Sequence, residues 1–365
     1  MRPLLLVVYS LVDFCENMIL SDLKNGLSGI MRVKNEAMMI EECIDSCIDA
    51  LDELIVVCND CSDSTPEILE RKKVQYPEKI KVYYYNHNVL SFDLTEEECR
   101  YALSLPDDSL RLYCNQCNYG LGNVTHKFAV KIDTDQIYFK SELKHWRDIC
   151  CGERKSFRAS YIAGWFFMMY ITLYRRLSAA LKTPCLFLLP DFLVKWFAPS
   201  YRQYAEYCLQ RGKASIALSG VNVFKDDGWF VTFDNYNIHP PYNGEGDTVI
   251  FKVSDQTFFT RTSSGRGSFS VTEKFNQPYK MMFAGPIWFH QHANRPRCWE
   301  KVHQLKSMDP NSFVPLEQFV RMKYSQVCKK MDPGATTLYQ RILFAVVHKI
   351  GLNAVIENEH LLSNR

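Results

Sequence analysis

Two aspartates separated by a single residue, Asp133 and Asp135, follow a hydrophobic run in this chain. The run, residues 126–132 (HKFAVKI), has the composition of a strand. Carboxylates that follow a strand lie at its carboxyl end, where open α/β sheets keep their ligands. Oxygen ligands on a short turn suit Mg²⁺ or Mn²⁺. A D-x-D tripeptide is common on solvated turns, but its place after a strand predicts a divalent metal site at Asp133 and Asp135.

A second cluster of candidate ligands lies in residues 286–292 (PIWFHQH). If this segment is a strand, His290 and His292 fall on one face, because side chains alternate along a strand. Imidazoles in this position can bind a metal ion or a diphosphate. The alternative is a pair of core histidines with satisfied nitrogens. We predict a metal or diphosphate contact and favour His290.

The segments around the first cluster alternate between strand and helix patterns. Four short apolar runs predict strands: 27–33, 54–58, 80–85 and 126–132. Helices are predicted at 37–51 and at about 66–74, and strand–helix–strand order is typical of parallel βαβ units. A helical stretch at 139–213 is followed by three more strand-like runs: 216–223, 228–233 and 248–251. The predicted fold class is α/β, with a helical tail from 296.

Three segments occur in the order seen in one enzyme group: Arg32-Val33-Lys34-Asn35-Glu36, Cys58-Asn59-Asp60-Cys61-Ser62-Asp63-Ser64-Thr65, and Lys131-Ile132-Asp133-Thr134-Asp135. Over residues 27–140 the chain resembles GT-A glycosyltransferases, most closely the large inverting family 2. The resemblance implies a Rossmann-like, mostly parallel sheet with a helical insertion and C-terminal helices. It also implies a nucleotide-sugar donor, here a UDP-sugar, with Mn²⁺ or Mg²⁺ gripping its diphosphate at the D-x-D motif.

Carried over residue by residue, the resemblance implies donor contacts for nine residues: Arg32, Asn35, Glu36, Asn59, Asp60, Asn118, Gly120, Lys127 and Asp133. The first five would touch the base and ribose, while Asn118 and Gly120 would border the donor pocket or form an ordinary turn. Lys127 would reach a phosphate or remain a solvated charge. Many GT-A enzymes complete the metal shell with a histidine, which supports His290 or His292. Asn59 stands where the family usually has Asp, and Cys61 where Gly is common, so the identity of the base stays open.

An inverting transfer needs a general base that deprotonates the acceptor hydroxyl. Asp247 is the first candidate and Glu245 the second, because Gly244-Glu245-Gly246-Asp247-Thr248 resembles the family's acidic motif. The alternative there is a polar loop. Asp226-Asp227-Gly228 is better explained as a hairpin turn.

Composition restricts the partners. The 365 residues carry 43 Lys and Arg against 41 Asp and Glu, so the net charge of +2 does not indicate nucleic-acid binding. Residues 159–197 are rich in aromatic side chains with arginines beside them, which is typical of helices lying on a membrane surface. A buried core helix or an oligomer contact is the alternative. The expected acceptor is a surface-polysaccharide glycan or glycolipid, and the expected location is cytoplasmic, at the membrane face.

The fourteen cysteines include two C-x-x-C pairs, Cys58/Cys61 and Cys114/Cys117. Their wide separation disfavours a four-cysteine zinc module, and free thiols in a reducing compartment are the simpler account. The loop 263–268 with Arg266 is a candidate to close over the donor. The N-terminal run 1–12 is too short to span a bilayer and predicts a buried strand or short helix.

Five regions follow from these patterns: an N-terminal extension (1–26), a nucleotide-sugar half (27–140), a helical insertion (141–213), an acceptor half (214–295) and a helical C-terminal region (296–365). A sugar nucleotidyltransferase shares metal carboxylates on an α/β sheet. It would require a Gly-rich loop with a lysine, for which Ser28-Gly29 with Arg32 and Lys34 is a poor substitute. A non-catalytic carbohydrate-binding or membrane-binding protein is the remaining alternative.

Overall fold

The computed structural model describes residues 22–152, 158–181, 191–233, 241–243, 248–264, 269–323, 326–327, 330 and 352–363. The chain forms two compact units: unit 1 is Met1–Thr134 with Phe251–Tyr279, and unit 2 is Asp135–Ile250 with Lys280–Arg365. The boundary therefore falls inside the D-x-D tripeptide. Residues 251–279 belong to unit 1, whereas the sequence analysis grouped them with 214–295. The predictions for residues 1–21, for Arg266 and for residues 331–351 of the helical tail lie outside the described residues.

Unit 1 is built on four parallel strands in the order β4-β1-β2-β3. The strands are β1 (Lys24–Val33), β2 (Glu53–Cys58), β3 (Ile80–Tyr84) and β4 (His126–Ile132). All six residues of β2 are buried, as expected for a parallel strand covered on both faces. The predicted βαβ pattern is confirmed here.

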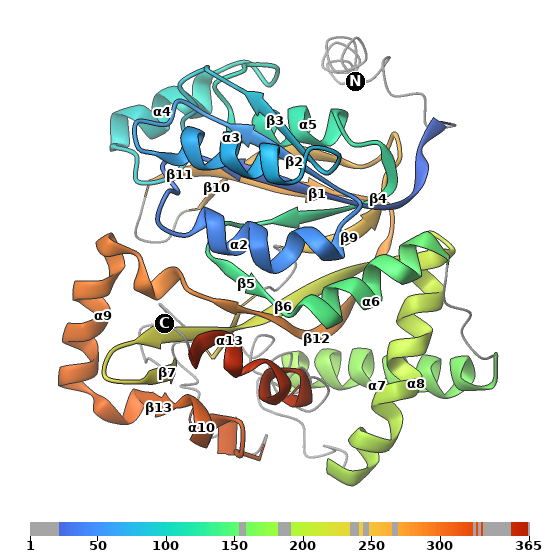
Figure 1. Cartoon of the computed structure of the whole chain (residues 1–365). Coiled ribbons are helices and arrows are strands. Elements are labelled where there is room, and N and C mark those ends of the chain that lie inside the picture. Colours follow the sequence, from blue (N-terminus) through green and yellow to red (C-terminus); the bar gives the residue numbers. More distant parts are fainter. Residues whose placement is uncertain are drawn as a thin grey trace. The chain divides into compact units, whose positions relative to one another are not determined.

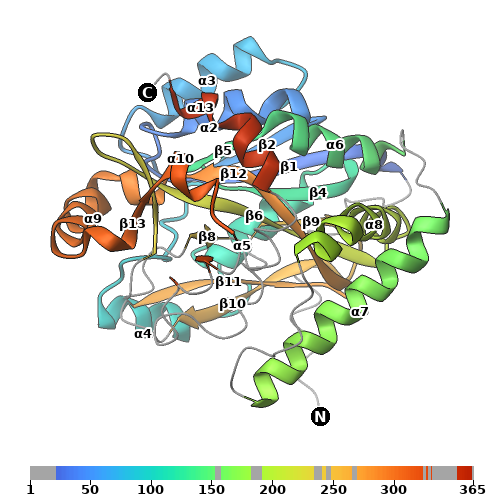
Figure 2. The same cartoon turned by 90° about the horizontal axis from the view of Figure 1, so that it is seen from below.

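Helices cover both faces of this parallel sheet (Figures 1 and 2). They are α2 (Ile40–Cys47), α3 (Thr65–Gln75) and α5 (Tyr113–Gly122), while α4 (Glu96–Ser104) packs against strand β11 (Ser270–Asn276). Helices α2 and α3 lie on one face. On the other face, α5 packs against β1 and β2 and against a hairpin formed by β10 (Phe258–Ser264) and β11 (Ser270–Asn276). The hairpin thus joins the parallel sheet through α5, although more than 130 residues separate α5 from the hairpin in sequence.

Unit 2 is arranged around one long buried strand, β6 (Ala214–Lys225). Strand β12 (Lys280–His290) pairs with β6 in parallel, and β7 (Trp229–Thr232), β8 (Tyr242–Asn243) and residues 249–250 of β9 (Val249–Lys252) pair with it antiparallel. Beyond these, β5 (Gln136–Tyr138) pairs with β12, and β13 (Phe313–Pro315) pairs with β7. Antiparallel pairing of β6 and β7 confirms the predicted turn at Asp226-Asp227-Gly228.

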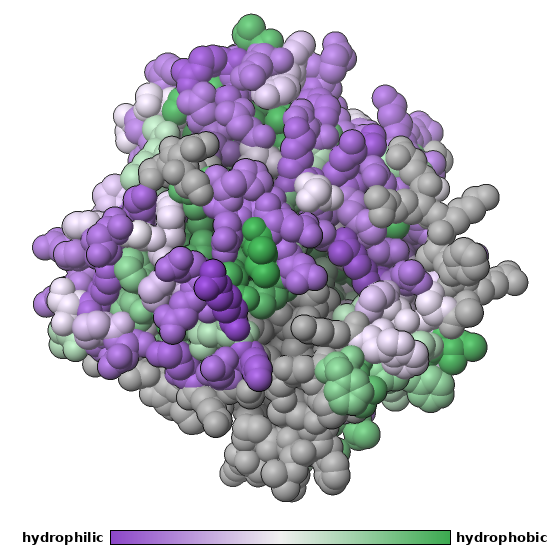
Figure 3. Space-filling view, turned by 60° about the horizontal axis from the view of Figure 1, so that its bottom comes forward, coloured by the Kyte–Doolittle hydropathy of each residue, from purple (hydrophilic) through white to green (hydrophobic). Residues whose placement is uncertain are grey.

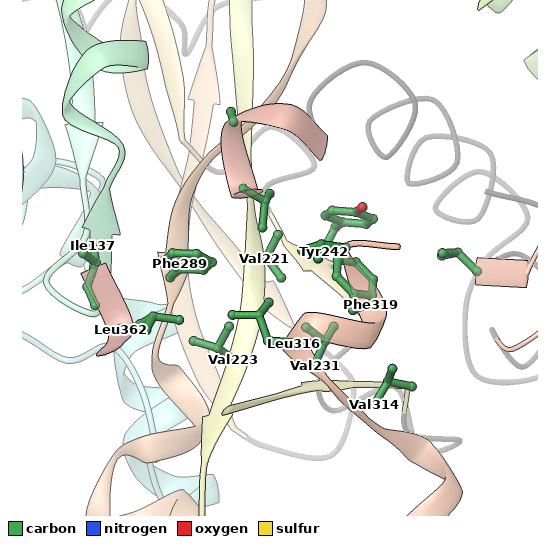
Figure 4. Packing of buried hydrophobic residues seen from close by; sticks show 14 of the residues in the cluster. Ile137, Val221, Val223, Val231, Tyr242, Phe289, Val314, Leu316, Phe319 and Leu362 are labelled. Carbon is green, nitrogen blue, oxygen red and sulfur yellow. The ribbon is translucent and has the colours of Figure 1, made fainter. Parts of the chain in front are cut away.

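The core of unit 2 is an apolar cluster that fixes the strands carrying the candidate metal ligands (Figure 4). Ile137 of β5, Val221 of β6 and Phe289 of β12 point into it from neighbouring strands. Residues from α10 (Leu316–Phe319), from the helical residues 352–358 and from α13 (His360–Ser363) close the cluster. Asp135 and His290 directly adjoin β5 and Phe289, so this packing sets their positions.

The predicted helical stretch 139–213 forms three helices: α6 (Lys140–Cys151), α7 (Arg158–Leu181) and α8 (Asp191–Gln210). Helices α7 and α8 pack together at Gly164, where a Cβ atom would lie 2.1 Å from the Ser200 carbonyl oxygen, so only glycine fits. No described helix is long and apolar enough to cross a bilayer. The tail contains α9 (Pro296–Met308) as predicted, and also strand β13, which the helical interpretation missed.

Candidate active site

The carboxyl ends of three strands meet at one edge of unit 1. Val33 of β1 pairs with Cys58 of β2, and Met31 pairs with Ile132 of β4. The loops that follow these strands therefore emerge side by side, as the sequence analysis expected for ligand-binding loops of an α/β sheet.

The first two of these loops are held together by hydrogen bonds. Asn35 has a left-handed backbone (φ 56°), and its Oδ1 accepts hydrogen bonds from the backbone N–H (2.7 Å) and the hydroxyl of Ser62. The Glu36 N–H donates to the Thr65 hydroxyl at 2.8 Å. These hydrogen bonds between the two loops fix their conformation relative to each other.

Asn59 and Asp60 have opposite surroundings. Asn59 is buried, and its amide group lies 2.7 Å from the Tyr85 carbonyl oxygen, to which it can donate. Asp60 is exposed, has a φ of 39°, and accepts a hydrogen bond from the Asn88 N–H at 2.6 Å. Of this pair, Asp60 is therefore the accessible candidate for a donor contact.

Arg32 lies inside unit 1 with its side chain only 3% exposed. It donates to Asp133 at 2.9 Å and to Glu273 of β11 at 2.6 Å, and its guanidinium stacks over the Tyr113 ring. With two carboxylates bound and little exposed surface, Arg32 positions Asp133 in this structure, although the resemblance implied a nucleotide contact.

Lys131 completes this ion-pair group. Its Nζ lies 3.1 Å from Glu273 and 3.6 Å from Asp133. Burial alone would raise the pKa of Glu273, but the charges of Lys131 and Arg32 outweigh burial and lower that pKa to about 2. Arg32 and Lys131, which are both paired with Glu273, thus hold the Asp133 side chain, which is 25% exposed, at the carboxyl end of β4.

Three other residues predicted to contact the donor make contacts within the protein instead: Asn118, Gly120 and Lys127. Both polar atoms of the Asn118 side chain bond the backbone of Phe259 in β10, at 2.9 and 2.8 Å. Gly120 lies within α5, where a Cβ would come within 2.8 Å of Ile30, so glycine allows the helix to pack on the sheet. Lys127 bonds Asn25 near the start of β4, about 20 Å along the strand from Asp133 at ~3.3 Å per residue.

Unit 2 brings Asp135, His290 and His292 together. One ligand atom from each lies within 4.8 Å of the others, and among the described residues no other group of three or more His, Cys, Asp or Glu side chains is placed this way. His290 Nε2 lies 3.4 Å from Asp135 Oδ1, and His292 Nδ1 lies 3.2 Å from Asp135 Oδ2. One carboxylate and two imidazoles suit a divalent metal with mixed oxygen and nitrogen ligands.

The two histidines reach Asp135 from different elements. His290 is the last residue of β12, but His292 begins the short helix η3 (His292–Asn294), so the expectation that both lie on one strand was wrong. The strand ends because Gln291 turns, and its N–H donates to the Asp135 carbonyl oxygen at 2.7 Å. Both rings nevertheless face Asp135 and stack with centroids 5.8 Å apart.

Asn222 orients His290. Its Oδ1 lies 2.5 Å from His290 Nδ1, and an amide oxygen can only accept, so Nδ1 carries the proton. In this tautomer the other ring nitrogen, Nε2, is the one that faces Asp135. A histidine held in this tautomer is prepared to ligate a metal.

Arg295 is a third side chain whose nitrogen atoms contact the Asp135 carboxylate. Its Nε and guanidinium NH2 group lie 3.3 and 3.2 Å from Asp135 Oδ2. Burial alone would raise the pKa of Asp135, but His290, His292 and Arg295 together hold it well below its usual range. The carboxylate is therefore ionised at neutral pH, as a metal ligand must be.

Four residues of the site were not predicted from the sequence to have a role in it: Lys131, Glu273, Asn222 and Arg295. Lys131 and Arg295 stand within four residues of Asp135 and His292, so proximity to a candidate ligand was the available signal. Glu273 and Asn222 reach their partners only through the hairpin and through β6, and a single sequence carries no local signal for such contacts.

Asp247 and Glu245 lie outside the described residues. The residues on either side of them belong to unit 2: Asn243 pairs with Gly220 of β6, and the Thr248 hydroxyl lies 3.5 Å from the Gln136 amide. Asp226 is bound to Lys306 at 2.6 Å, in keeping with its place in the β6–β7 turn.

Comparison with known proteins gives a family for one part of the chain. Residues 28–90 match the family described as glycosyl transferase family 2. This match confirms, for that segment, the family resemblance predicted from the sequence. No curated protein matches the chain.

Among solved structures, the chain is similar to glucosyl-3-phosphoglycerate synthase from Mycobacterium tuberculosis, crystallised with Mn²⁺, UDP and phosphoglyceric acid. The identity is 21%, the TM-score is 0.20, and the match covers 38% of this chain and 39% of the synthase. This chain thus spans about two fifths of the synthase's length. S. aureus TarS (residues 1–349, with UDP) is 12% identical over 92% of this chain and 91% of that one, with a TM-score of 0.32.

Proposed function

We propose that this chain is a metal-dependent glycosyltransferase that moves a hexose from a UDP-sugar to a glycan or lipid-linked acceptor, with inversion at the anomeric carbon. The observation that carries the proposal is the Asp135–His290–His292 cluster, whose ligand atoms lie within 4.8 Å of one another. The family 2 segment at residues 28–90 supplies the reaction class. A divalent ion bound at the cluster would neutralise the negative charge of the departing nucleotide diphosphate.

The ligand set favours Mn²⁺ over Mg²⁺. Mg²⁺ is usually bound through oxygen atoms alone, whereas Mn²⁺ also accepts imidazole nitrogen. His290 Nε2 is available because the opposite ring nitrogen is bound to Asn222. Arg295, which contacts the same carboxylate, would bind a phosphate oxygen of the donor, since guanidinium groups pair well with phosphate.

The donor's nucleoside is assigned to the loops at the carboxyl edge of unit 1. Asp60 offers an exposed carboxylate there, and Asn35 offers an exposed amide. Carboxylate oxygens accept hydrogen bonds from ribose hydroxyls or from the uracil N–H, so this chemistry suits UDP. Asp133, held by Arg32, remains our proposed donor contact at the end of β4.

The general base is assigned to Asp247, with Glu245 as the second choice. Inversion requires a base that accepts the proton of the acceptor hydroxyl as it attacks. Asp247 directly precedes Thr248, whose hydroxyl contacts the residue that follows Asp135. Asp247→Ala should leave UDP-sugar binding intact and remove turnover; normal turnover would make this assignment wrong.

Helices α7 and α8 are proposed to rest on an anionic membrane surface, where a lipid-linked acceptor would be found, on the cytoplasmic side. Exposed apolar side chains recur along α7 at helical spacing and continue on α8: Ile162, Trp165, Phe166, Met169, Leu173, Leu177, Phe192 and Trp196. Figure 3 shows apolar side chains gathered at the lower right of its view. The 24 residues of α7 include three arginines and no Asp or Glu, which suits anionic lipid.

The test is a panel of nucleotide-sugar donors incubated with the full chain, with and without Mn²⁺. UDP-sugar hydrolysis or transfer should appear with Mn²⁺, disappear in EDTA and return when Mn²⁺ is restored. Full activity in excess EDTA would exclude the metal role, and thermal stabilisation by no donor in the panel would exclude the donor class.

A further inference from the structure

Two thiols stand face to face at the carboxyl edge of unit 1. Cys58 is the buried last residue of β2, and Cys61 follows three residues later in the loop, only partly buried. Their Sγ atoms lie 3.5 Å apart. A disulfide needs an S–S distance of about 2.05 Å, so a small loop movement would close the bond.

The surroundings of the pair favour charge on Cys61. The Cys58 and Cys61 thiols share a hydrogen bond, and the Asn35 N–H donates to the Cys61 sulfur from 3.4 Å. The hydrogen bond with Cys58 is the main cause that lowers the pKa of Cys61 to about 7, against the opposing effects of burial and Asp63. The same hydrogen bond and burial raise the pKa of Cys58, so Cys61 is the nucleophile and Cys58 holds the proton.

The second C-x-x-C pair lacks these features. Cys114 and Cys117 are both buried in helix α5. Burial raises the pKa of Cys114 to about 11 and that of Cys117 to about 12. Both thiols are therefore protonated at neutral pH, and the chain contains its own matched control for the first pair.

We propose that Cys58 and Cys61 form an oxidant-reactive dithiol, a modification site that closes to a disulfide by exchange with a small-molecule disulfide such as oxidised glutathione. The Cys61 thiolate attacks one sulfur of that disulfide, which forms a mixed disulfide and releases one glutathione thiolate. Cys58 then attacks the Cys61 sulfur, forms the intramolecular bond, and releases the second glutathione. Overall, the protein loses two hydrogens and two glutathione thiols appear, so atoms and electrons balance.

The disulfide would alter the loop that carries the proposed nucleotide contacts, and this consequence rests on the proposed function. Asn59 and Asp60 are the two residues enclosed between the cysteines. In the reduced protein the Cys61 sulfur accepts a hydrogen bond from the Asn35 N–H. Closing the disulfide draws that sulfur toward Cys58 and away from the Asn35 N–H. We expect the oxidised loop to bind UDP more weakly, by about tenfold.

The experiment treats the reduced full-length protein with oxidised glutathione, alkylates the remaining thiols and maps the cysteine peptides by mass spectrometry. The peptide with Cys58 and Cys61 should lose two hydrogens and escape alkylation until a dithiol reductant is added. Cys58→Ser should trap glutathione on Cys61, Cys61→Ser should leave Cys58 open to alkylation, and Cys114→Ser should behave as the wild type. The inference is overturned if Cys58 and Cys61 stay alkylatable under these conditions, or if Cys114 and Cys117 oxidise first.

UDP binding to the reduced and oxidised proteins separates this inference from the proposed function. Weaker binding after oxidation, reversed by reductant, supports both. A disulfide that forms without changing UDP affinity overturns the regulatory consequence. If the disulfide forms but neither redox state binds UDP, the dithiol stands and the proposed function fails.

Discussion

Asn222 is the residue that best separates a metal site from a chance grouping of side chains, because it contacts His290 and is not itself one of the candidate ligands. Its Oδ1 lies 2.5 Å from His290 Nδ1 and fixes the ring's orientation. Asn222→Ala should weaken Mn²⁺ binding by about 10–100-fold, as removal of such orienting partners does. Mn²⁺ affinity is measured by calorimetry, with Asn294→Ala, a change at a nearby amide bonded to the backbone, as control. Unchanged affinity for Asn222→Ala would mean that His290 is not a ligand.

Glu53 gives a pH-dependent contribution to stability. It is buried and accepts hydrogen bonds from the Ser28 hydroxyl and the Thr125 N–H, both at 2.6 Å, and it pairs with Lys81. Burial would raise its pKa, but His126, Lys81 and these hydrogen bonds outweigh burial and lower the pKa below the ordinary 4.5.

Because the pKa in the folded state is lower than in the unfolded state, the stabilisation is fully present above pH 4.5 and is lost as the pH falls through the folded value. Glu53→Gln should therefore cost about 1–3 kcal/mol at neutral pH and progressively less toward about pH 3. Urea unfolding across this range checks the trend, with the exposed Glu96→Gln as control. An equal cost at every pH would contradict the account.

At the residue scale, the sequence predicted which side chains could bind a metal better than it predicted which side chains contact one another. Asp135, His290 and His292 were identified by residue type and by their position next to strands. Arg32 was assigned to the nucleotide by resemblance, yet it lies buried between Asp133 and Glu273. Glu273 could not be anticipated, because 241 residues separate it from Arg32.

At the element scale, strands that contain a short apolar run were predictable, whereas the two strands of the β10–β11 hairpin were not. The uninterrupted apolar run of β2 and the shorter apolar runs of β1 and β4 mark buried parallel strands. Strands β10 and β11 carry Thr, Ser, Lys and Glu on a half-exposed hairpin, so their pattern resembles a loop. Helices α4 and α5 lie in the turn-rich stretch 87–125, where polar composition hid the helical spacing.

The attachment of the β10–β11 hairpin to α5 depends on Asn118. Its side chain satisfies both the N–H and the carbonyl of Phe259 in a buried position. Asn118→Ala would leave both groups unpaired and should destabilise the protein by about 2–4 kcal/mol. Thermal unfolding measures this, and Asn123→Ala, a partly buried helix-end amide, serves as control. Normal stability with weakened donor binding would instead support the original donor-contact interpretation.

The apolar stripe on α7 and α8 makes a separate prediction at this scale. Replacing Trp165 and Phe166 by serine should release the protein from vesicles that contain anionic phospholipid, because both side chains are exposed and anchor the stripe. Cosedimentation measures binding, and the control replaces two exposed apolar residues off the stripe, Val74 and Met308. Retained binding by the double variant, or a change of oligomeric state instead, would favour a protein contact.

At the scale of the whole molecule, the order of elements was more predictable than their grouping. The α/β class and the parallel strands of the first half follow from hydrophobic patterns that are local in sequence. The return of residues 251–279 to unit 1 depends on contacts of α5 with β10 and β11. The boundary between the two units, which falls between Thr134 and Asp135, likewise has no signal in the sequence of this tripeptide.

The central claim is that Asp135 holds a divalent metal together with His290 and His292. Mn²⁺ binding to the full chain, measured by electron paramagnetic resonance as the loss of the free-ion signal, tests it most directly. The wild type should bind one Mn²⁺ per chain, Asp135→Asn should abolish that binding, and Asp226→Asn, which alters a carboxylate paired with Lys306, should retain it. Equal Mn²⁺ binding by the wild type and Asp135→Asn would contradict the account.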